Sequence, residues 1–508
     1  MATPAANLAT SLEFLKALQD QGVTAIRASY LTRIHRERLL KNGFLREVMK
    51  GWYIPARPDE EAGESTAWYA SFWSFVADYL NERFAQAWCL SPEQSIAIHT
   101  GEWTVPRQVL VRTPTGGNKP TTLPFGTSIL DARLALPATH DMEVQHGLRV
   151  YQLPAALIAC SPTNMATQPV TMRAALAGLG DPSELLRRLL DGGHSRIAGR
   201  LVGGLRHIGR GGAADQILDT MRAAGYTVSE VNPFGDVEPV VLGNASAPVQ
   251  RLRMLWAKMR SDVLEHFTPP PQGRPDKTTY LRHVDEVYGA DAYNSLSIEG
   301  YCVNADLIER VCTGDWNPGS IAADRQQRDA LAARGYWQAF QRVKMSVSKV
   351  LDGQSAGVVV GADHSAWYRE LFAPSVAAGL MKASDLAGYR NRPVFIRRSM
   401  HVPARAEAMR ELVPAFFDLL ANEAEPAVRV VLGHFMFVYI HPYFDGNGRM
   451  GRFMMNVMMA SGGYPWTVVP VAARAEYMAA LEAASVEQNI VPFAQFLDAL
   501  VNSNRALE

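Results

Sequence analysis

The segment His441–Arg452, with the sequence HPYFDGNGRMGR, contains residue types that could transfer a phosphoryl or nucleotidyl group. His441 stands at its start, where Pro442 restricts the backbone, and a histidine can accept a proton from a hydroxyl group at neutral pH. Asp445 offers a hard oxygen ligand for a Mg²⁺ ion that bridges phosphates. The segment therefore predicts a general base and a metal ligand within one short loop.

Glycines and arginines in the same segment could bind the phosphates themselves. Gly446 and Gly448 permit backbone conformations that other residues avoid, so successive N–H groups can form an anion-binding nest. The nest opens the next predicted helix, whose N-terminus adds positive potential. Arg449 and Arg452 have i, i+3 spacing, which places both guanidinium groups on one helix face. Such a set of groups is typical of phosphoryl- and nucleotidyl-transfer sites.

Two apolar segments must hold this loop in place. Residues 427–440 (AVRVVLGHFMFVYI) precede it, and residues 452–460 (RFMMNVMMA) follow it. Both are hydrophobic on nearly every face, as expected of helices in the centre of a bundle. The methionines of the second segment are expected to be core residues rather than ligands of a cofactor.

The loop resembles the signature of the Fic family, H-P-F-x-[DE]-G-N-G-R-x-x-R, at every position but one. Tyr443 replaces the usual phenylalanine, an aromatic exchange that the core should tolerate if the hydroxyl group finds a partner. The resemblance implies that a target hydroxyl group, deprotonated by His441, attacks the α-phosphorus of ATP and takes AMP while pyrophosphate leaves. It assigns Mg²⁺ to Asp445, and the nucleotide contacts to Asp445, Gly446, Asn447, Gly448, Arg449 and Arg452. The alternative is a structural loop between two helices.

A second motif predicts autoinhibition. Ser295, Glu299 and Gly300 fit the inhibitory pattern of the family, [ST]-x-x-x-E-[GN], on a predicted helix near 291–300. Positions i and i+4 share a helix face, so Ser295 and Glu299 should point the same way. A carboxylate there could pair bidentately with Arg452 and hold it away from the γ-phosphate. The alternative is a glutamate in an ordinary surface salt bridge.

The first 57 residues predict a winged helix that binds DNA. Two helical stretches are followed by the strand-like sequences FLREV and WYIP, which flank the turn Met49-Lys50-Gly51. From Arg27 to Lys50 there are seven basic and two acidic residues, a local charge of +5. Basic side chains there could neutralise DNA phosphates, and the alternative is a solvated helix face. The candidate DNA contacts are Arg33, Arg36, Arg38 and Lys50.

The chain as a whole predicts a multidomain, mainly α protein. We expect a winged helix over 1–57, an α/β domain over 58–245, and an all-α Fic bundle over 246–508 with a β-hairpin flap at 388–403. The first two of these regions resemble AbiEi-type antitoxins, through the stretches RERLLKNGFLREVMKGWYIP and LSPEQSIAIHTGEWTVPRQVLVRT. That resemblance implies a toxin–antitoxin context and binding to the protein's own promoter DNA.

Overall composition says little about partners. The 508 residues include 50 Lys and Arg and 50 Asp and Glu, so the net charge is zero and only local charge is informative. The start of the chain lacks the basic and apolar regions of a signal peptide, and the apolar run Val430–Ile440 is too short to span a bilayer. The four cysteines show no metal-site spacing and are expected to be free thiols in a reducing cytoplasm.

Together these features predict an autoinhibited, cytoplasmic, bacterial protein adenylyltransferase. It would use ATP and Mg²⁺ to modify a Thr, Tyr or Ser hydroxyl group of a target protein and of itself, with no membrane partner and with a homodimer left open. One alternative is a DNA-binding autorepressor whose Fic module mainly senses nucleotide. Another is an enzyme that removes AMP, with Glu299 positioning a water molecule. His441, Asp445 and Arg452 favour an enzyme, because a sensor does not need a general base.

Overall fold

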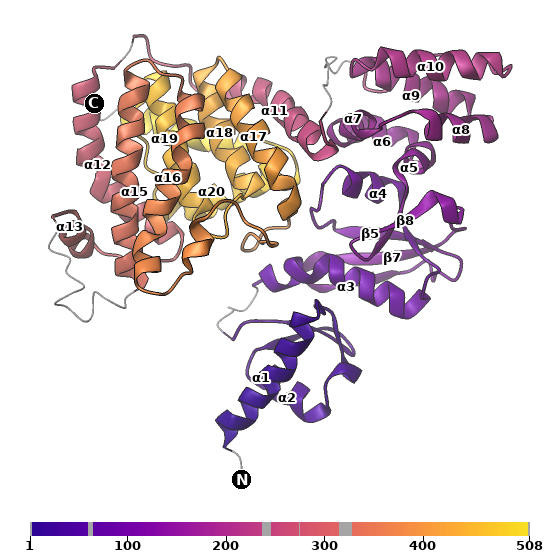
Figure 1. Cartoon of the computed structure of the whole chain (residues 1–508), viewed down its shortest axis with the longest axis horizontal. Coiled ribbons are helices and arrows are strands. Elements are labelled where there is room, and N and C mark those ends of the chain that lie inside the picture. Colours follow the sequence, from indigo (N-terminus) through magenta and orange to yellow (C-terminus); the bar gives the residue numbers. More distant parts are fainter. Residues whose placement is uncertain (1–2, 59–63, 236–244, 274, 314–327, 506–508) are drawn as a thin grey trace. The chain divides into compact units, whose positions relative to one another are not determined.

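The computed structural model shows two compact units, and helices predominate in the chain as the sequence predicted (Figure 1). The residues that the structure describes are 3–58, 64–235, 245–273, 275–313 and 328–505. The first unit joins Met1–Arg251 to the short segment Phe395–Val402, and the second joins Leu252–Val394 to Pro403–Glu508. Within the described ranges, no helix is both long and apolar enough to cross a membrane.

The first unit begins with two helices and a three-stranded antiparallel sheet in the order β1-β3-β2. Its elements are α1 (Pro4–Asp20), β1 (Ile26–Arg27), η1 (Ala28–Tyr30), α2 (Arg33–Lys41), β2 (Leu45–Met49) and β3 (Trp52–Pro55). Thr32 caps α2, because its side chain accepts a hydrogen bond from the backbone N–H of His35. Gly51, at a φ of +83°, supplies the left-handed turn between β2 and β3. The order of two helices followed by a hairpin is the one that the sequence predicted, and the first helix begins at Pro4.

A longer helix, α3 (Thr66–Phe84), leads into a sheet with the strand order β4-β5-β7-β6. β5 and β7 run parallel, and the other neighbouring strands pair antiparallel. Val109 and Val111, on the buried face of β5, share a core with Trp68 of α3. The strands are β4 (Cys89–Leu90), β5 (Gln108–Thr113), β6 (Pro120–Thr122) and β7 (Ser128–Arg133).

A hairpin and a group of short helices complete the first unit. The helices enclose an apolar cluster that includes Leu176, Leu201 and Ile217. The described part of region 58–245 therefore contains both strands and helices. The elements are α4 (Pro92–His99), β8 (Met142–Gln145), β9 (Leu148–Tyr151), α5 (Leu153–Ala159), α6 (Pro162–Thr167), α7 (Pro169–Gly178), α8 (Ser183–Asp191), α9 (Ser195–His207) and α10 (Gly211–Ala223).

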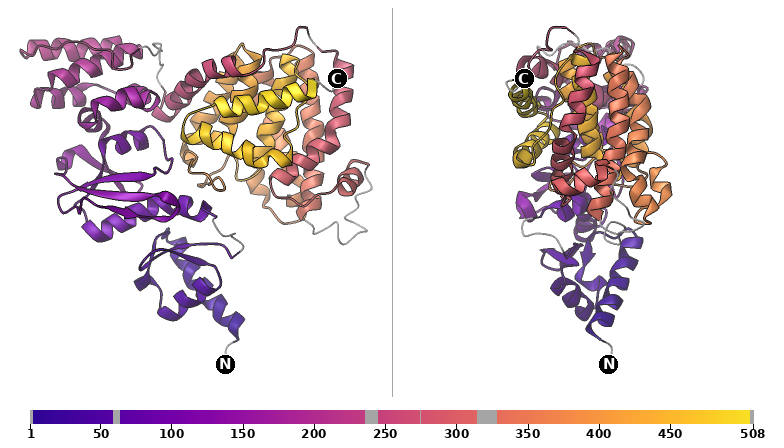
Figure 2. Two further views of the ribbon diagram at one scale, coloured as in Figure 1. Left: turned by 180° about the vertical axis from the view of Figure 1, so that it is seen from behind. Right: turned by 90° about the vertical axis from the view of Figure 1, so that its left-hand side faces the viewer.

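The second unit is a bundle of helices. Its helices are α11 (Ala247–His266, which begins in the first unit), α12 (Lys277–Ile298), α13 (Ala305–Thr313), α15 (Arg328–Leu351), α16 (Ala356–Ala377), α17 (Met409–Asn422), α18 (Pro426–Ile440), α19 (Asn447–Gly462), α20 (Arg474–Val486) and α21 (Val491–Arg505). α19 contacts α15 and α16, whereas α18 contacts α20 and α21. Figure 2 shows α20 and α21, in yellow, on the face of the bundle opposite to α15 and α16. The pair α18 and α19 therefore forms the centre of the bundle, as their apolar sequences predicted.

The segment predicted as a β-hairpin flap, 388–403, contains no strand. Its backbone groups have partners elsewhere: Met400 O accepts a hydrogen bond from Val105 N at 2.9 Å, and Arg398 N donates to Thr66 Oγ1 at 2.9 Å. Two prolines within 388–403 also lack the N–H group that a strand ladder needs. The expected hairpin is therefore replaced by irregular backbone, half of which packs in the first unit.

A buried carboxylate holds that part of the segment. Glu64 is 2% exposed and lies 3.0 Å from Arg397 Nε and 3.1 Å from Arg398 Nε. Burial alone would raise the pKa of Glu64, but hydrogen bonds from Thr66 and from the two arginines lower it to about 2. The carboxylate is therefore ionised at neutral pH and attracts both arginines.

Candidate active site

His441 lies at the C-terminal end of α18, where its φ of +53° turns the chain into the loop. Its Nδ1 atom lies 3.1 Å from the carbonyl oxygen of Val438. A carbonyl can only accept a hydrogen bond, so Nδ1 carries the proton and Nε2 keeps its lone pair. Burial lowers the pKa of His441 to about 4, so the imidazole is neutral at pH 7. This ring can accept a proton through Nε2.

Asn447 closes the loop that follows His441. Its Oδ1 atom accepts a hydrogen bond from Tyr443 N at 2.9 Å, and its Nδ2 atom donates to Tyr443 O at 2.8 Å. Asn447 is 1% exposed, so both polar atoms of this side chain hold the loop backbone in place. The predicted contact of Asn447 with a phosphate group stays a prediction. The Tyr443 ring stacks on Tyr368 at 3.8 Å between centroids, which shows how the core accommodates tyrosine here.

The glycines and Asp445 lie at the beginning of α19. Gly446 caps this helix at a φ of +77°, and its N–H donates to Asp445 Oδ1 at 2.6 Å. Gly448 lies in the first turn, where backbone N–H groups have no partner within the helix. The Asp445 side chain is 56% exposed. A helix N-terminus with these features can bind a phosphate group.

Asp445 is the sequence-predicted ligand of Mg²⁺. Among the described residues, no group of three or more His, Cys, Asp or Glu side chains could hold a metal ion. Mg²⁺ is often held by one or two carboxylates together with phosphate oxygens and water, so one exposed carboxylate beside a phosphate site fits this ion.

Arg452 is bound to the predicted inhibitory motif. Its Nη2 atom lies 2.7 Å from Glu299 Oε1 and donates to the backbone oxygen of Ser295 at 3.0 Å, while Nε donates to Ser295 Oγ at 2.9 Å. Arg452 is 3% exposed; burial lowers its pKa, but the charge of Glu299 outweighs this and raises it. The structure thus brings Ser295, Glu299 and Arg452 together. The pairing differs from the expected bidentate one, because Ser295 takes the place of the second carboxylate oxygen.

Arg449 is enclosed by aromatic rings. Its guanidinium carbon lies 5.1 Å from the centroid of Tyr301 and 5.0 Å from that of Phe372. Only 1% of Arg449 is exposed, and its Nη2 atom lies 3.5 Å from Asp445 Oδ2. Burial lowers the pKa of Arg449, while the charge of Asp445 raises it, and the net direction is upward. Both arginines are therefore close to the loop, but each is covered by a part of the chain.

Two neighbours of the arginines were not found from the sequence. Asp291, buried one turn before Ser295, accepts a hydrogen bond from the hydroxyl group of Tyr336 at 2.6 Å. Burial raises the pKa of Asp291 to about 6. The i, i+4 spacing from Asp291 to Ser295 was a signal that could have identified Asp291, whereas Tyr301 follows the motif with no pattern that marks it.

The four candidate DNA contacts divide into two that make hydrogen bonds within the first unit and two that are exposed. Arg36 donates to Ala28 O at 2.9 Å, and Arg38 donates to Asn7 O at 2.8 Å, so both stabilise the fold. Lys50 is exposed, and the side chain of Arg33 is 81% exposed although it pairs with Glu37. Of the four candidate DNA contacts, Arg33 and Lys50 therefore face solvent. Arg33 lies at the start of α2, and Lys50 lies in the turn between β2 and β3.

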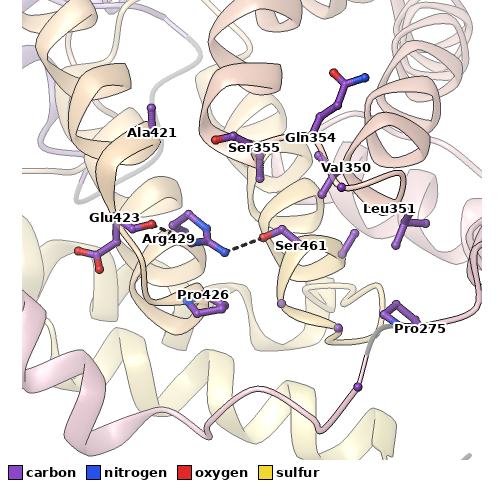
Figure 3. A pocket seen from close by; sticks show the side chains of 16 residues that line it. Pro275, Val350, Leu351, Gln354, Ser355, Ala421, Glu423, Pro426, Arg429 and Ser461 are labelled. Atoms are coloured by element: carbon purple, nitrogen blue, oxygen red, sulfur yellow. Dashed lines mark hydrogen bonds between the residues drawn. The ribbon is translucent and has the colours of Figure 1, made fainter.

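A cavity of about 240 Å³ in the second unit does not belong to this site (Figure 3). Pro426 of α18 and Ser461 of α19 line it, and Figure 3 shows Arg429 donating a hydrogen bond to Ser461 Oγ. α18 ends at the loop that begins with His441, and its first residue, Pro426, lines this cavity. With a rise of 1.5 Å per residue, its length separates the two by about 20 Å.

A second cavity, of about 520 Å³, lies beside the loop. It is lined by Phe444, by Tyr389 and by the charged side chains of Lys382, Asp385 and Arg392. The guanidinium group of Arg392 lies 5.2 Å from the centre of the Phe444 ring, which fixes one wall next to Asp445.

Comparison with known proteins identifies the class of this site. Residues 365–459, which include the whole loop, match the Fic/DOC family, and the chain therefore carries a Fic domain. Protein adenylyltransferase fic-1 from Caenorhabditis elegans is 32% identical over 112 residues, which are 21% of this chain and 22% of that protein. Protein adenylyltransferase Fic from Nematostella vectensis is 36% identical over 113 residues, or 22% of this chain and 26% of that protein. The chain thus matches about a quarter or less of the length of these relatives.

The comparison extends to solved structures. A structure of Fic-1 from C. elegans aligns with 67% of this chain and 94% of its own length, at 20% identity and a TM-score of 0.37. A Fic domain protein from Bacteroides thetaiotaomicron aligns with 50% of this chain and 95% of its own length, at 19% identity and a TM-score of 0.34.

Proposed function

We propose that this chain is a protein adenylyltransferase that transfers AMP from ATP to a hydroxyl group of a protein. The observation that carries this proposal is the neutral His441 ring, whose Nε2 atom is free to accept a proton at the entrance to α19. The hydroxyl oxygen would attack the α-phosphorus, the bond from that phosphorus to the bridging oxygen would break, and pyrophosphate would leave. The hydroxyl proton would pass to His441 Nε2.

Charge around the loop supports the same reaction. The N-terminus of α19 would bind phosphate oxygens through its free N–H groups, and Arg449 and Arg452 would neutralise the outer phosphates. Mg²⁺, held by Asp445 and phosphate oxygens, would offset the negative charge of the nucleotide. The relatives in C. elegans and N. vectensis are named protein adenylyltransferases, which agrees with this chemistry.

We further propose that Glu299 inhibits the enzyme. In the present arrangement Arg452 is paired with Glu299 and Ser295, so its Nη2 and Nε donors are not available to a γ-phosphate. ATP would have to displace a buried charge-assisted pair before its outer phosphates could contact Arg452. The enzyme would therefore be active only after the end of α12 moves or Glu299 is replaced.

The target would approach along the cavity beside Phe444, because this cavity adjoins the loop between His441 and α19. Its lining combines aromatic rings with charges of both signs, which suits a peptide segment carrying a Thr, Tyr or Ser hydroxyl group. Self-modification would follow when a hydroxyl group of a second copy of the chain enters the same cavity.

A direct test is to incubate the Glu299→Gly protein with α-labelled ATP and Mg²⁺, alone and in cell lysate, and to measure intact masses. The proposal expects proteins that gain one AMP group, and no such gain with the double variant Glu299→Gly/His441→Ala. Modification that persists without His441 would contradict the assigned base. Loss of AMP from a pre-modified protein, with no transfer, would instead support the alternative of AMP removal.

DNA binding is a second candidate function, favoured by the exposed positions of Arg33 and Lys50. A helix and a hairpin that present cations to solvent can bind DNA phosphates and release counterions. The full chain would then act as a repressor at its own promoter, and the Fic module could report nucleotide levels to it. A mobility shift with promoter DNA at low salt tests this function independently of AMP transfer.

A further inference from the structure

The end of α12 contacts both arginines of the loop, not only Arg452. Glu299 caps this helix, and the next residue, Gly300, has a left-handed φ of +86°. Gly300 N donates to Ser297 O, and Tyr301 N donates to Leu296 O at 3.1 Å. This is the hydrogen-bond pattern of a glycine-terminated helix, and it fixes the direction of the residue after the glycine.

That direction brings Tyr301 against Arg449. The guanidinium group lies between the rings of Tyr301 and Phe372, at 5.1 and 5.0 Å from their centroids. Cations are attracted to the faces of aromatic rings, and more strongly when water is excluded. The side chain of Arg449 is 1% exposed and Tyr301 is 9% exposed, so water is largely excluded from this contact.

Two of the three nitrogen atoms of the Arg449 guanidinium group make no hydrogen bond in this arrangement. Its Nε and Nη2 atoms are buried and have no hydrogen-bond partner among the described residues. A buried guanidinium donor without an acceptor is costly, so these atoms are suited to a ligand oxygen that arrives later. The nearby Asp445 carboxylate, at 3.5 Å from Nη2, is too far away to satisfy them.

Of the two rings that cover Arg449, Tyr301 is the one that lies outside a helix, and its ring also lies 5.1 Å from the guanidinium carbon of Arg328, the first residue of α15. Phe372 lies in α16 and also packs close to Gly446. Tyr301 lies beyond the end of α12, before the short helix α13. Movement of the helix end would therefore uncover Arg449 and release Arg452 together.

We propose that Tyr301 is a positioning residue that restrains Arg449, as Glu299 restrains Arg452. The end of α12 would then keep both arginines from contacting the outer phosphates of ATP. This inference rests on the proposed nucleotide site and deepens the proposed inhibition. It predicts that Tyr301 opposes the binding of outer phosphates and has no effect on the nucleoside or the α-phosphate.

The test compares the binding of ATP and AMP by calorimetry, in a His441→Ala background that prevents turnover. Tyr301→Ala should lower the dissociation constant for ATP about three- to tenfold, since it removes one cation–π contact, and should leave that for AMP within about twofold. Tyr301→Phe, which keeps the ring, should bind both nucleotides as the parent does. If Tyr301→Ala fails to fold, Tyr301→Leu keeps the apolar packing and should still tighten ATP binding.

Unchanged ATP affinity in Tyr301→Ala, or an equal gain for AMP, would overturn the inference. If neither nucleotide binds any variant, the proposed nucleotide site itself is wrong and the inference falls with it. If the binding pattern holds while the Glu299→Gly protein transfers no AMP, the proposed activity fails and the role of Tyr301 stands.

Discussion

The carboxylate of Glu299 occupies the space that a side chain at position 448 would need, because its Oε1 atom is in close contact with the Cβ position of Gly448. Gly448 does not have a left-handed φ, so its backbone alone does not require glycine. Glycine is required at position 448 because the Glu299 carboxylate leaves no room for a Cβ atom there. Glu299 and the first turn of α19 are therefore in direct contact.

Replacing Glu299 with glycine should activate self-modification. The change removes the partner of Arg452 and frees space above Gly448, and a charge-assisted pair of this kind is worth a few kcal/mol, or roughly a 10²-fold rate increase. Labelled ATP with excess Mg²⁺ measures the rate. Adding Arg452→Ala to Glu299→Gly should abolish the gain, and equal rates in the wild-type and Glu299→Gly proteins would contradict autoinhibition.

His441→Ala should fold and bind ATP, yet lose AMP transfer by about 10²- to 10⁴-fold, the usual effect of removing a general base. The Glu299→Gly protein is the suitable background because its rate is measurable. Gln at position 441 is the matched control, since it keeps a polar side chain but accepts no proton at neutral pH. A rate near that of the parent in either variant would show that another group is the base.

The pH dependence of AMP transfer should lack a step near pH 6.5. Burial lowers the pKa of His441 to about 4, so the reactive neutral ring is already fully populated at pH 5.5. The rate of the Glu299→Gly protein should therefore be nearly constant from pH 5.5 to 7.5, apart from the effects of other groups. A sharp fall in this rate below pH 6.5 would contradict the expectation, because it would show an ordinary histidine pKa in the folded protein.

His434 should make the protein less stable in acid. It is fully buried, its Nε2 atom lies 2.7 Å from Tyr477 Oη, and burial lowers its pKa to about 3. The unfolded chain therefore binds a proton at His434 below pH 6.5 while the folded chain does not, and stability falls as pH falls. From pH 7.5 to 5 the expected loss is about 2 kcal/mol in the free energy of unfolding.

Urea denaturation followed by tryptophan fluorescence measures this loss at both pH values. The variant His434→Gln has no titrating side chain at this position, so its stability should fall by about 2 kcal/mol less over the same interval. A loss of the same size in both proteins would show that other groups cause the pH dependence.

Asn447→Ala should lower stability as well as activity. The change leaves the buried N–H and C=O groups of Tyr443 without their partners, at a cost of about 1–3 kcal/mol each. Thermal unfolding and ATP binding measured together separate this role from the one predicted by sequence. Loss of ATP affinity with an unchanged Tm would instead support a direct phosphate contact.

Arg33→Ala and Arg38→Ala should affect different properties, the first DNA binding and the second stability. Arg33 is exposed, so its loss should weaken DNA binding by the full chain with little change in Tm. The slope of the logarithm of the binding constant against the logarithm of the salt concentration should fall by about one, as expected for one lost phosphate contact. Arg38 donates to Asn7 O and to Ser11 Oγ, so its loss should lower Tm. No binding to promoter DNA at low salt by the unaltered protein would contradict the DNA-binding proposal.

The shape of the loop and the contact of Ser295 and Glu299 with Arg452 could be predicted because each depends on residues close together in sequence, whereas inhibition by Glu299 stays a prediction. The i, i+4 relation of Ser295 and Glu299 follows from helix geometry alone, and the structure places both against Arg452. The orientation of Asn447 could not be predicted in this way. An exposed or an inward side chain fits the same sequence, and only the buried backbone groups of Tyr443 decide between them.

Features that depend on contacts between residues distant in sequence could not be predicted. The hairpin at 388–403 was expected from the local sequence pattern. In the structure, however, backbone groups of this segment make hydrogen bonds with residues distant in sequence, such as Val105 and Thr66. Tyr301 was missed for a similar reason. Its contact with Arg449 depends on a glycine-terminated helix and on the fold that brings α12 to α19.

The segment Phe395–Val402 also affects whether recombination could exchange one of the two units for an unrelated domain. It completes the first unit although its neighbours on both sides in the sequence belong to the second. A recombination event that joined residues 1–251 to an unrelated gene would leave the Glu64 carboxylate without Arg397 and Arg398. Because an unpaired buried charge is strongly destabilising, the two units are expected to pass together from one genome to another rather than as exchangeable modules.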